Sequence, residues 1–419
     1  MTTQADQDVP ARFPHAPDAP DRRPRRSEQR RRAQRVHQRA MTAYVAALVL
    51  LGLAVPVLGW IGVQVILDSS DGQVVDPQLD PNEPGFQALV APSPTLLVLH
   101  VDDAGGLVGT TLLGLPSEDG DGGGVLLVPP ATVGDVPDIG ELPIDAAYAY
   151  SGLDAARATA EWALGISIDD VVVLDPAEWS DVISSTGPLA LTNPDVLRDA
   201  EGDVAFPAGE LVLEPSQVPA YAAALQPGES RLNRLFRQEL VWRAWLDAMA
   251  EDPTAVQFPG EQERGLARFL PTIASGTVHL EALPVEPVPV SDPSTPETFV
   301  AAPEVLDRVI PEVVPFPASN AGGSRPLVRV LAGTGPQEGT VEVARRVVAA
   351  GGQVVLVGNA DRFDHAETQI TYWDDTRREE AQEVAEALGF GTVTRVDEVD
   401  ESADIVVVIG QDLAGALGT

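Results

Sequence analysis

The sequence predicts an α/β protein with two folded parts that follow a single N-terminal membrane helix. Residues 40–67 form a long stretch without a charged side chain, which indicates the membrane helix. Short apolar runs alternate with helical patterns in residues 95–285 and again in 327–413, as expected for sheets covered by helices. Residues 286–326 are rich in proline, which is typical of a semi-rigid linker and places a domain boundary there.

The uncharged stretch Ala40–Leu67 is long enough to cross a bilayer as a helix, because ~20 apolar residues span its ~30 Å hydrocarbon core. Ten arginines precede it, from Arg12 to Arg39, and the next basic residue is Arg157. Basic residues beside a span stay in the cytoplasm, so the N-terminus is expected inside and the folded parts outside. A cleaved signal peptide is the alternative, but no small-x-small cleavage site follows the stretch.

The two sides of this span have opposite charge. Residues 1–39 are expected to be a disordered, arginine-rich tail that rests on anionic lipid headgroups, with nucleic acid as the alternative ligand. The remainder has 17 basic and 58 acidic residues, a formal net charge of −41, which repels nucleic acid. The absence of cysteine excludes disulfides, a thiol nucleophile and a thiolate metal site.

The first folded part is expected to be an α/β sandwich, reached through a polar stalk at residues 68–94. Its pattern contains apolar runs bounded by turn residues and helical runs with a glycine or proline at one end. The predicted strands are 95–103, 107–116, 123–130, 171–175 and 276–285, and the predicted helices are 151–165, one beginning at Pro176, and 230–250.

The second folded part is expected to be a compact module of its own. One short helix at Pro303–Val309 interrupts the linker before it. Residues 327–413 then show a β-α-β-β-α-β order with one extra strand, which is long enough to bury a core.

Both parts resemble proteins of the bacterial cell envelope. Residues 328–335 (VRVLAGTG) and 357–372 (VGNADRFDHAETQITY) resemble the LytR C-terminal domain, although Ala332 stands where that family usually has asparagine. The first part resembles a divergent LytR-CpsA-Psr domain. The stretches that carry this resemblance are 142–152 (LPIDAAYAYSG), 164–175 (LGISIDDVVVLD), 206–213 (FPAGELVL) and 231–238 (RLNRLFRQ).

The LytR-CpsA-Psr family attaches glycopolymers to peptidoglycan from polyprenyl-pyrophosphate carriers, so the resemblance implies a site that stabilises phosphate charge with arginines and a metal ion. The family's arginine and aspartate at the end of the third strand are replaced here by a segment containing Pro129 and Pro130. The family's aspartate at the start of the first strand has no counterpart in residues 93–99 (SPTLLVL), and the family's asparagine is replaced by Asp145. We therefore expect no catalytic residue in this domain.

The arginines of the segment 230–250 remain as a candidate binding site. Arg234, Arg237 and Gln238 match the family pattern, and Arg231 lies one turn away, so these four residues are predicted to bind a pyrophosphate lipid. The alternative is a basic helix face paired with neighbouring acids such as Glu229 and Glu239.

A second candidate site lies in a loop of the C-terminal module, at Asp361, Arg362, Asp364 and His365. A structural loop network is the alternative. No two histidines have metal-ligand spacing, and acidic pairs such as Asp102 and Asp103 are expected to be solvated turn residues, so no metal or other cofactor is predicted.

The sequence therefore favours a non-catalytic, single-pass protein of the bacterial plasma membrane that binds, scaffolds or regulates cell-wall glycopolymer assembly. Expected partners are the lipid bilayer, polyprenyl-linked glycan, peptidoglycan or wall-assembly proteins, and not nucleic acid. One alternative is an active phosphotransferase that uses Mg²⁺ with Arg157, Arg231, Arg234 and Arg237. Another is the transcription regulator that the family's historical name suggests.

Overall fold

The computed structural model describes much of the chain from residue 80 onward. These residues belong to one compact unit, Val75–Thr419. The predicted tail (1–39) and membrane helix (40–67) lie outside the described residues. No helix in the described part is long and apolar enough to cross a membrane. The described residues are 80–117, 120–136, 140–251, 258, 264–289, 296–320, 323, 325–400 and 402–418.

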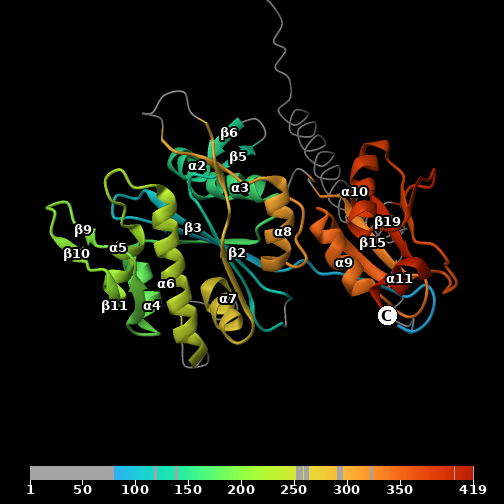
Figure 1. Cartoon of the computed structure of the whole chain (residues 1–419), viewed down its shortest axis with the longest axis horizontal. Helices are drawn as coiled ribbons and strands as arrows, with labels where there is room; N and C mark the ends of the chain where they lie inside the picture. Colours follow the sequence, from blue (N-terminus) through green and yellow to red (C-terminus); the bar gives the residue numbers. More distant parts are fainter. Residues whose placement is uncertain are drawn as a thin grey trace, which may run out of the picture. The chain divides into compact units, whose positions relative to one another are not determined.

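A five-stranded sheet organises the first folded part (Figure 1). Its three central strands are antiparallel to one another, and the two edge strands β12 and β7 each run parallel to the central strand beside them. The strands, in spatial order, are β12 (Val278–Ala282), β4 (Gly123–Val128), β3 (Leu107–Gly114), β2 (Thr95–Val101) and β7 (Asp170–Leu174).

Alternate residues of β2 enter two different cores, because successive side chains of a strand point to opposite faces. Leu97 and Leu99 belong to one core, and Leu96 and Val98 to the other. The first core is covered by α2 (Ile144–Ser151), α3 (Leu153–Leu164) and α8 (Pro303–Val313). The second is covered by α4 (Pro176–Ser184), α5 (Val218–Ala223), α6 (Arg231–Glu251) and α7 (Gly265–Ala274).

Smaller elements surround these layers. Asp175 and Glu178 form a capping box that fixes the start of α4. The remaining pairs are β5 (Val133–Val136) with β6 (Gly140–Pro143), β8 (Leu189–Asn193) with β11 (Gly209–Leu213), β9 (Leu197–Arg198) with β10 (Val204–Phe206), and β13 (Glu286–Pro287) with β14 (Phe299–Val300), and a 3-10 turn η1 covers Pro215–Gln217.

The predicted linker, 286–326, contributes to the core of the first domain. Helix α8 buries Val309, Ile310 and Val313 against the sheet. A Cβ atom at Gly114 would lie 2.1 Å from the Val313 carbonyl oxygen, so the glycine allows this close approach. The prolines suggested a spacer, but one of them, Pro303, begins the helix, where proline is favoured.

The C-terminal module has a six-stranded sheet in the order β1-β16-β15-β19-β17-β18. The predicted order of strands and helices is present, and the last helix, α11, was not predicted. The elements are β15 (Leu327–Ala332), α9 (Thr340–Ala349), β16 (Gln353–Asn359), β17 (Gln369–Tyr372), η2 (Asp375–Arg377), α10 (Arg378–Leu388), β18 (Thr392–Arg395), β19 (Ile405–Ile409) and α11 (Gln411–Leu417).

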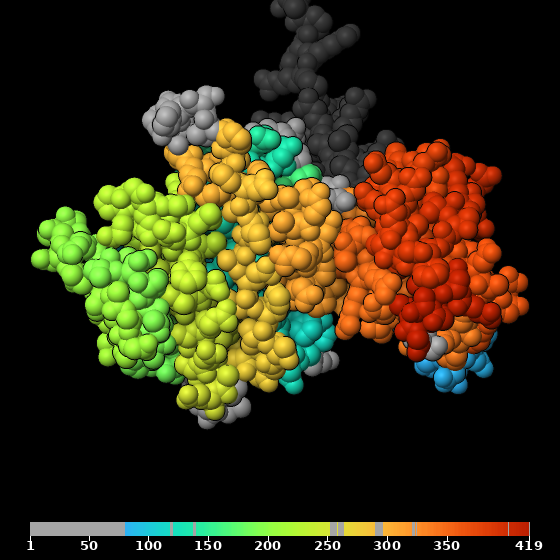
Figure 2. Space-filling view, in the orientation of Figure 1, coloured from blue at the N-terminus to red at the C-terminus, as the bar shows by residue number. Residues whose placement is uncertain are grey.

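The remaining strand of this sheet comes from the predicted stalk, 68–94. Strand β1 (Gln87–Leu89) pairs antiparallel with β16 of the C-terminal module. Figure 2 shows this early segment, in blue, against the orange and red surface of the module. The end of the stalk segment is therefore part of a folded domain.

Candidate functional site at the start of helix α6

The predicted pyrophosphate-binding residues all lie in the first two turns of α6 (Arg231–Glu251). Arg234, Arg237 and Gln238 are buried, with exposed fractions of 8%, 2% and 5%. Buried arginines are costly unless their charge is compensated, so the partners of each side chain determine what it can do.

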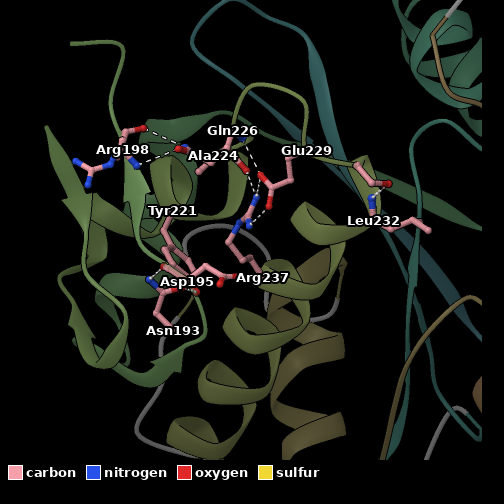
Figure 3. Close-up of polar contacts among 10 residues, drawn as sticks. Asn193, Asp195, Arg198, Tyr221, Ala224, Gln226, Glu229, Leu232 and Arg237 are labelled. Carbon is pink, nitrogen blue, oxygen red and sulfur yellow. Dashed lines mark hydrogen bonds and ion pairs between the residues drawn. The ribbon is translucent and has the colours of Figure 1, made fainter. Parts of the chain in front are cut away.

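Both terminal nitrogens of Arg237 are bound within the protein (Figure 3), while its buried Nε has no hydrogen-bond partner among the described residues. Its Nη1 donates to Glu229 Oε1 at 2.7 Å, and its Nη2 donates to Glu229 Oε2 at 2.9 Å and to the Ala224 carbonyl oxygen at 2.6 Å. The hydrogen bonds from Arg237 hold the pKa of Glu229 below its ordinary value. Arg237 therefore fixes the loop between α5 and α6. This pairing with Glu229 is the one that the alternative of a basic helix face paired with neighbouring acids describes.

Gln238 is likewise held by the backbone. Its Nε2 donates to the carbonyl oxygens of Val108 at 2.9 Å and Ala222 at 3.1 Å. A Cβ atom at Gly109 would lie 2.9 Å from this nitrogen, so the amide fills the space that a larger residue on β3 would occupy. Gln238 thus connects α6 to β3 and α5.

Arg231 reaches across to α2, where its Nη1 contacts Asp145 Oδ2 at 2.6 Å. The residue that departs from the family pattern, Asp145, thus neutralises one of the predicted site arginines. Arg157 does not join this group. It pairs with Glu161 at 3.1 Å on α3, a helix whose buried residues belong to the core on the other face of the sheet from α6.

Arg234 is different from its neighbours on α6. It makes no hydrogen bond or ion pair within the part of the chain that the structure describes. Burial lowers its pKa, and the adjacent Arg231 lowers it further, while Asp145 and Asp102 act in the opposite direction. Among the three arginines of the predicted site on α6, Arg234 is therefore the one whose charge is available to an anion.

His100 is a member of this site that the sequence did not single out. It lies on β2, is 3% exposed, and its Nε2 lacks a hydrogen-bond partner among the described residues. Burial, with a smaller contribution from Arg234, lowers the pKa of His100 to about 4, so the imidazole is neutral near pH 7. A lone histidine within the otherwise apolar run TLLVLHV was the available signal.

Aromatic side chains fill the interior next to this polar group. Trp242 and Trp245 of α6 contact each other at 5.4 Å between ring centroids, and Trp179 of α4 lies 5.8 Å and 5.5 Å from them. Phe258 continues the cluster at 6.2 Å from Trp245. The cavity beside His100 has room for about one water molecule.

The predicted loop site in the C-terminal module divides into an exposed and a buried half. Arg362 pairs with Asp364 at 3.1 Å in solvent. His365 is buried, and its backbone joins the turn after β15 to the start of α11 through Gly333 and Gln411. Its Nε2 lies 3.5 Å from Asp361, but the geometry is not that of a hydrogen bond, and Asp361 is largely solvated. The arrangement supports the structural alternative.

Residues 326–413 match the family model described as LytR cell envelope-related transcriptional attenuator. This module is a LytR C-terminal domain. The LytR C-terminal domain of this chain also carries a buried polar residue that sequence reasoning missed, Asn359, whose exposed fraction is 0%.

The chain is also similar to solved structures, two of which carry the name of the other family. TagV of B. subtilis is 22% identical, with 52% of this chain and 94% of TagV covered, at a TM-score of 0.42. The LytR-CPS2A-psr family protein YwtF (TagT) with bound octaprenyl pyrophosphate lipid is 20% identical, with 57% and 92% covered, at 0.41. A LytR-Csp2A-Psr enzyme from Actinomyces oris is 18% identical, with 56% and 97% covered, at 0.38. No curated protein matches the chain.

The polar group at α6 is a poor fit for the divalent ion that the family resemblance implies. Within the described residues, no three His, Asp or Glu side chains come together in a way that could hold a metal ion. Asp145 is already paired with Arg231, which leaves Asp102 as the nearby carboxylate that acts on both Arg234 and His100. One carboxylate does not make a site for Mg²⁺, which prefers several oxygen ligands.

Proposed function

We propose that this chain is a non-catalytic cell-envelope protein, anchored in the bacterial plasma membrane by residues 40–67, that binds, scaffolds or regulates the assembly of cell-wall glycopolymers. Its partners on the outer side are polyprenyl-linked glycan, peptidoglycan or wall-assembly proteins. The LytR C-terminal domain supports a role at the cell envelope.

The observation that carries this proposal is that two of the α6 arginines are paired with carboxylates of the protein itself. Transfer from a pyrophosphate requires positive charge that is free to stabilise the developing charge on phosphate oxygens. Arg231 and Arg237 are instead neutralised by Asp145 and Glu229, at 2.6 Å and 2.7 Å. No arginine lies between residues 95 and 153 to replace them.

The aromatic interior is a second reason. A polyprenyl chain bound beside the α6 arginines would need an apolar cavity many times larger than a water molecule. The described space between β2 and α6 is occupied by Trp179, Trp242 and Trp245, which are between 0% and 3% exposed. A lipid chain could enter only if these rings moved.

The alternative is a working phosphotransferase of the LytR-CpsA-Psr type, and Arg234 is the observation that favours it. It is a buried cation without a hydrogen bond or ion pair within the described residues. It lies close enough to Asp102 and His100 that Asp102 raises the pKa of Arg234 and Arg234 lowers the pKa of His100. The version of this alternative that also includes Arg157 is not supported, because Arg157 is paired with Glu161 on α3.

Calorimetric titration of the full-length protein in detergent with a long-chain polyprenyl pyrophosphate, with and without Mg²⁺, tests the proposal. We expect no saturable binding that depends on Mg²⁺. Saturable binding that requires Mg²⁺, disappears in Arg234→Ala and persists in Arg243→Ala would favour the alternative. Arg243 is the matched control because it lies on the same helix, is exposed, and pairs only with Glu239 in the described structure.

A further inference from the structure

Residues 80–90, the latch segment, complete the sheet of the LytR C-terminal domain from outside that domain. Gln87, Ala88 and Leu89 lie opposite Gly358, Val357 and Leu356 of β16. Three further backbone hydrogen bonds extend the pairing in both directions: Gly85 N to Ala360 O at 2.9 Å, Asn359 N to Phe86 O at 2.7 Å, and Val90 N to Val355 O at 3.0 Å.

Two residues of the LytR C-terminal domain make a specific acceptor for this strand. Asn359 Nδ2 donates to the carbonyl oxygens of Pro81 at 2.9 Å and Glu83 at 2.7 Å, and Asn359 Oδ1 accepts from Gln337 N at 2.8 Å. At Gly358, a Cβ atom would lie 2.1 Å from the Phe86 carbonyl oxygen, and the nearest atoms it would meet all belong to the latch segment. Glycine at 358 therefore leaves space that only the docked strand uses.

The latch segment is held mainly by its backbone. None of residues 80–90 is buried, and the Leu89 side chain is 76% exposed. A segment with few buried apolar contacts opens at a small fraction of the global unfolding free energy. The edge that it covers is apolar, since Leu356 is 5% exposed with the latch segment in place. An uncovered edge of this kind pairs readily with another strand.

The chain also provides a hinge next to the latch segment. Ser93 lies between Pro92 and Pro94 and is fixed by the segment after α8: Ser93 N donates to Phe316 O at 2.8 Å, and Phe316 N donates to Ser93 Oγ at 3.0 Å. The next residue, Pro94, is held by the first domain, since its carbonyl oxygen accepts from Leu115 N at 3.0 Å. Opening therefore occurs on the N-terminal side of Ser93, and the flanking prolines favour an extended hinge. Short, stiff hinges of this kind favour exchange of a strand between identical chains.

We propose that the edge of β16, with Gly358 and Asn359, is an exchangeable strand-acceptor site, and that its second occupant is the latch segment of another copy of this chain. Reciprocal exchange closes a two-fold dimer, because each copy donates one strand and accepts one. A second copy is the occupant that fits best, since its segment supplies the same carbonyls for Asn359 and the same close approach at Gly358. The membrane anchor of the proposed function would bring copies together, but the exchange does not depend on whether the protein is catalytic.

The absence of cysteine from the chain makes a direct test simple. Ala88 and Val357 are opposite each other in the docked strand, at the ~5.5 Å Cα separation of a hydrogen-bonded antiparallel pair, which a disulfide can bridge. Full-length Ala88→Cys and full-length Val357→Cys are mixed in detergent or vesicles and oxidised. The expected product is a covalent dimer that contains one copy of each variant.

Two variants make this result specific. Gly358→Ala in the Val357→Cys chain is expected to lower the yield of mixed dimer at least about tenfold, since an alanine Cβ occupies the acceptor. Gly85→Val changes only the latch segment, at a position with φ of 82° and open space around it, and is expected to lower the yield when placed in the Ala88→Cys chain. If Gly358→Ala impairs folding, Gly85→Val still tests the site.

The double variant Ala88→Cys/Val357→Cys shows whether docking occurs within one chain. Its intramolecular disulfide is expected to close readily. Closure of this disulfide without any mixed dimer from the single variants would overturn the exchange, and so would a mixed dimer whose yield is the same with Gly358→Ala or Gly85→Val.

Discussion

The two halves of helix α6 differ in how much of a ligand site they retain. The first half carries Arg231, Arg234 and Arg237, so its positive charge is kept, although two of these cations are bound to internal carboxylates. The second half carries Trp242 and Trp245, which fill the space against the sheet. The difference teaches that residues whose types and spacing suggest a ligand site can be bound instead by structural partners within the chain.

The aromatic half is expected to give the largest change in stability. Trp245→Ala removes a side chain that is 0% exposed and should lower the free energy of unfolding by about 3–5 kcal/mol, because the surrounding rings collapse only partly into the cavity. Urea unfolding followed by circular dichroism measures this change. Trp245→Phe is the matched control and should lose much less, since a ring remains in place. Equal effects of the two variants would show that the cluster is loosely packed.

The polar half should respond almost as strongly at Arg237. Arg237→Ala leaves Glu229 without its cationic partner and the Ala224 carbonyl without a donor, and breaking such a buried pair costs about 3–5 kcal/mol. Arg243→Ala breaks an exposed pair on the same helix and should cost about 0–1 kcal/mol. The same urea titration compares both variants. A small loss for Arg237→Ala would mean that Arg237 is not a structural residue and would favour a ligand role.

His100 on β2, which lies beside Gln238 and Trp242 of α6, should make the stability of the protein depend on pH. The pKa of this histidine is about 4 in the folded protein and 6.5 unfolded, so the unfolded chain binds more protons between these values. The contribution of the neutral His100 to the free energy of unfolding is therefore fully present above pH 6.5. It is lost as the pH falls toward 4, by about 3 kcal/mol in total. Subtracting the pH profile of His100→Leu, measured by thermal unfolding, isolates this loss. Parallel profiles for the two proteins would contradict the assignment.

The smallest effect is expected at Arg234. Arg234→Met replaces a buried cation that lacks a hydrogen bond or ion pair among the described residues with an apolar chain, and should raise the free energy of unfolding by about 1 kcal/mol. Differential scanning calorimetry at pH 7 detects the rise. A loss of stability instead would show that Arg234 has a structural partner, and the polar half would then contain no available cation.

Much of this fold could be predicted from apolar periodicity. The segments 107–116 and 230–250 correspond to β3 and α6 within a few residues, because their apolar positions have strand or helix spacing. The docking of β1 could not be predicted, since the latch segment is polar, proline-rich and held by backbone hydrogen bonds that leave no pattern in side chains. Helix α8 was expected only as a short helix in a linker, although Val309, Ile310 and Val313 show helical spacing.

The sequence could predict which residues form the candidate site, but it could not predict the contacts that each of them makes. The spacing of Arg234, Arg237 and Gln238 matched the family, and all three are indeed close together on α6. Their partners come from distant parts of the chain, such as Asp145 on α2 and the Val108 carbonyl on β3, and such contacts depend on packing that one sequence does not encode locally. His100 was missed for the same reason, because its importance comes from Arg234, which lies on a different element.

A single-turnover assay tests the central claim that α6 has kept its arginines without keeping catalysis. Full-length protein in excess over a glycan-carrying polyprenyl pyrophosphate, with Mg²⁺ and a peptidoglycan acceptor, is followed for release of polyprenyl phosphate. The account predicts no release above the rate without protein, and the same rate for Arg234→Ala. Release by the unmodified protein that is lost in Arg234→Ala, with its folding intact by circular dichroism, would contradict it.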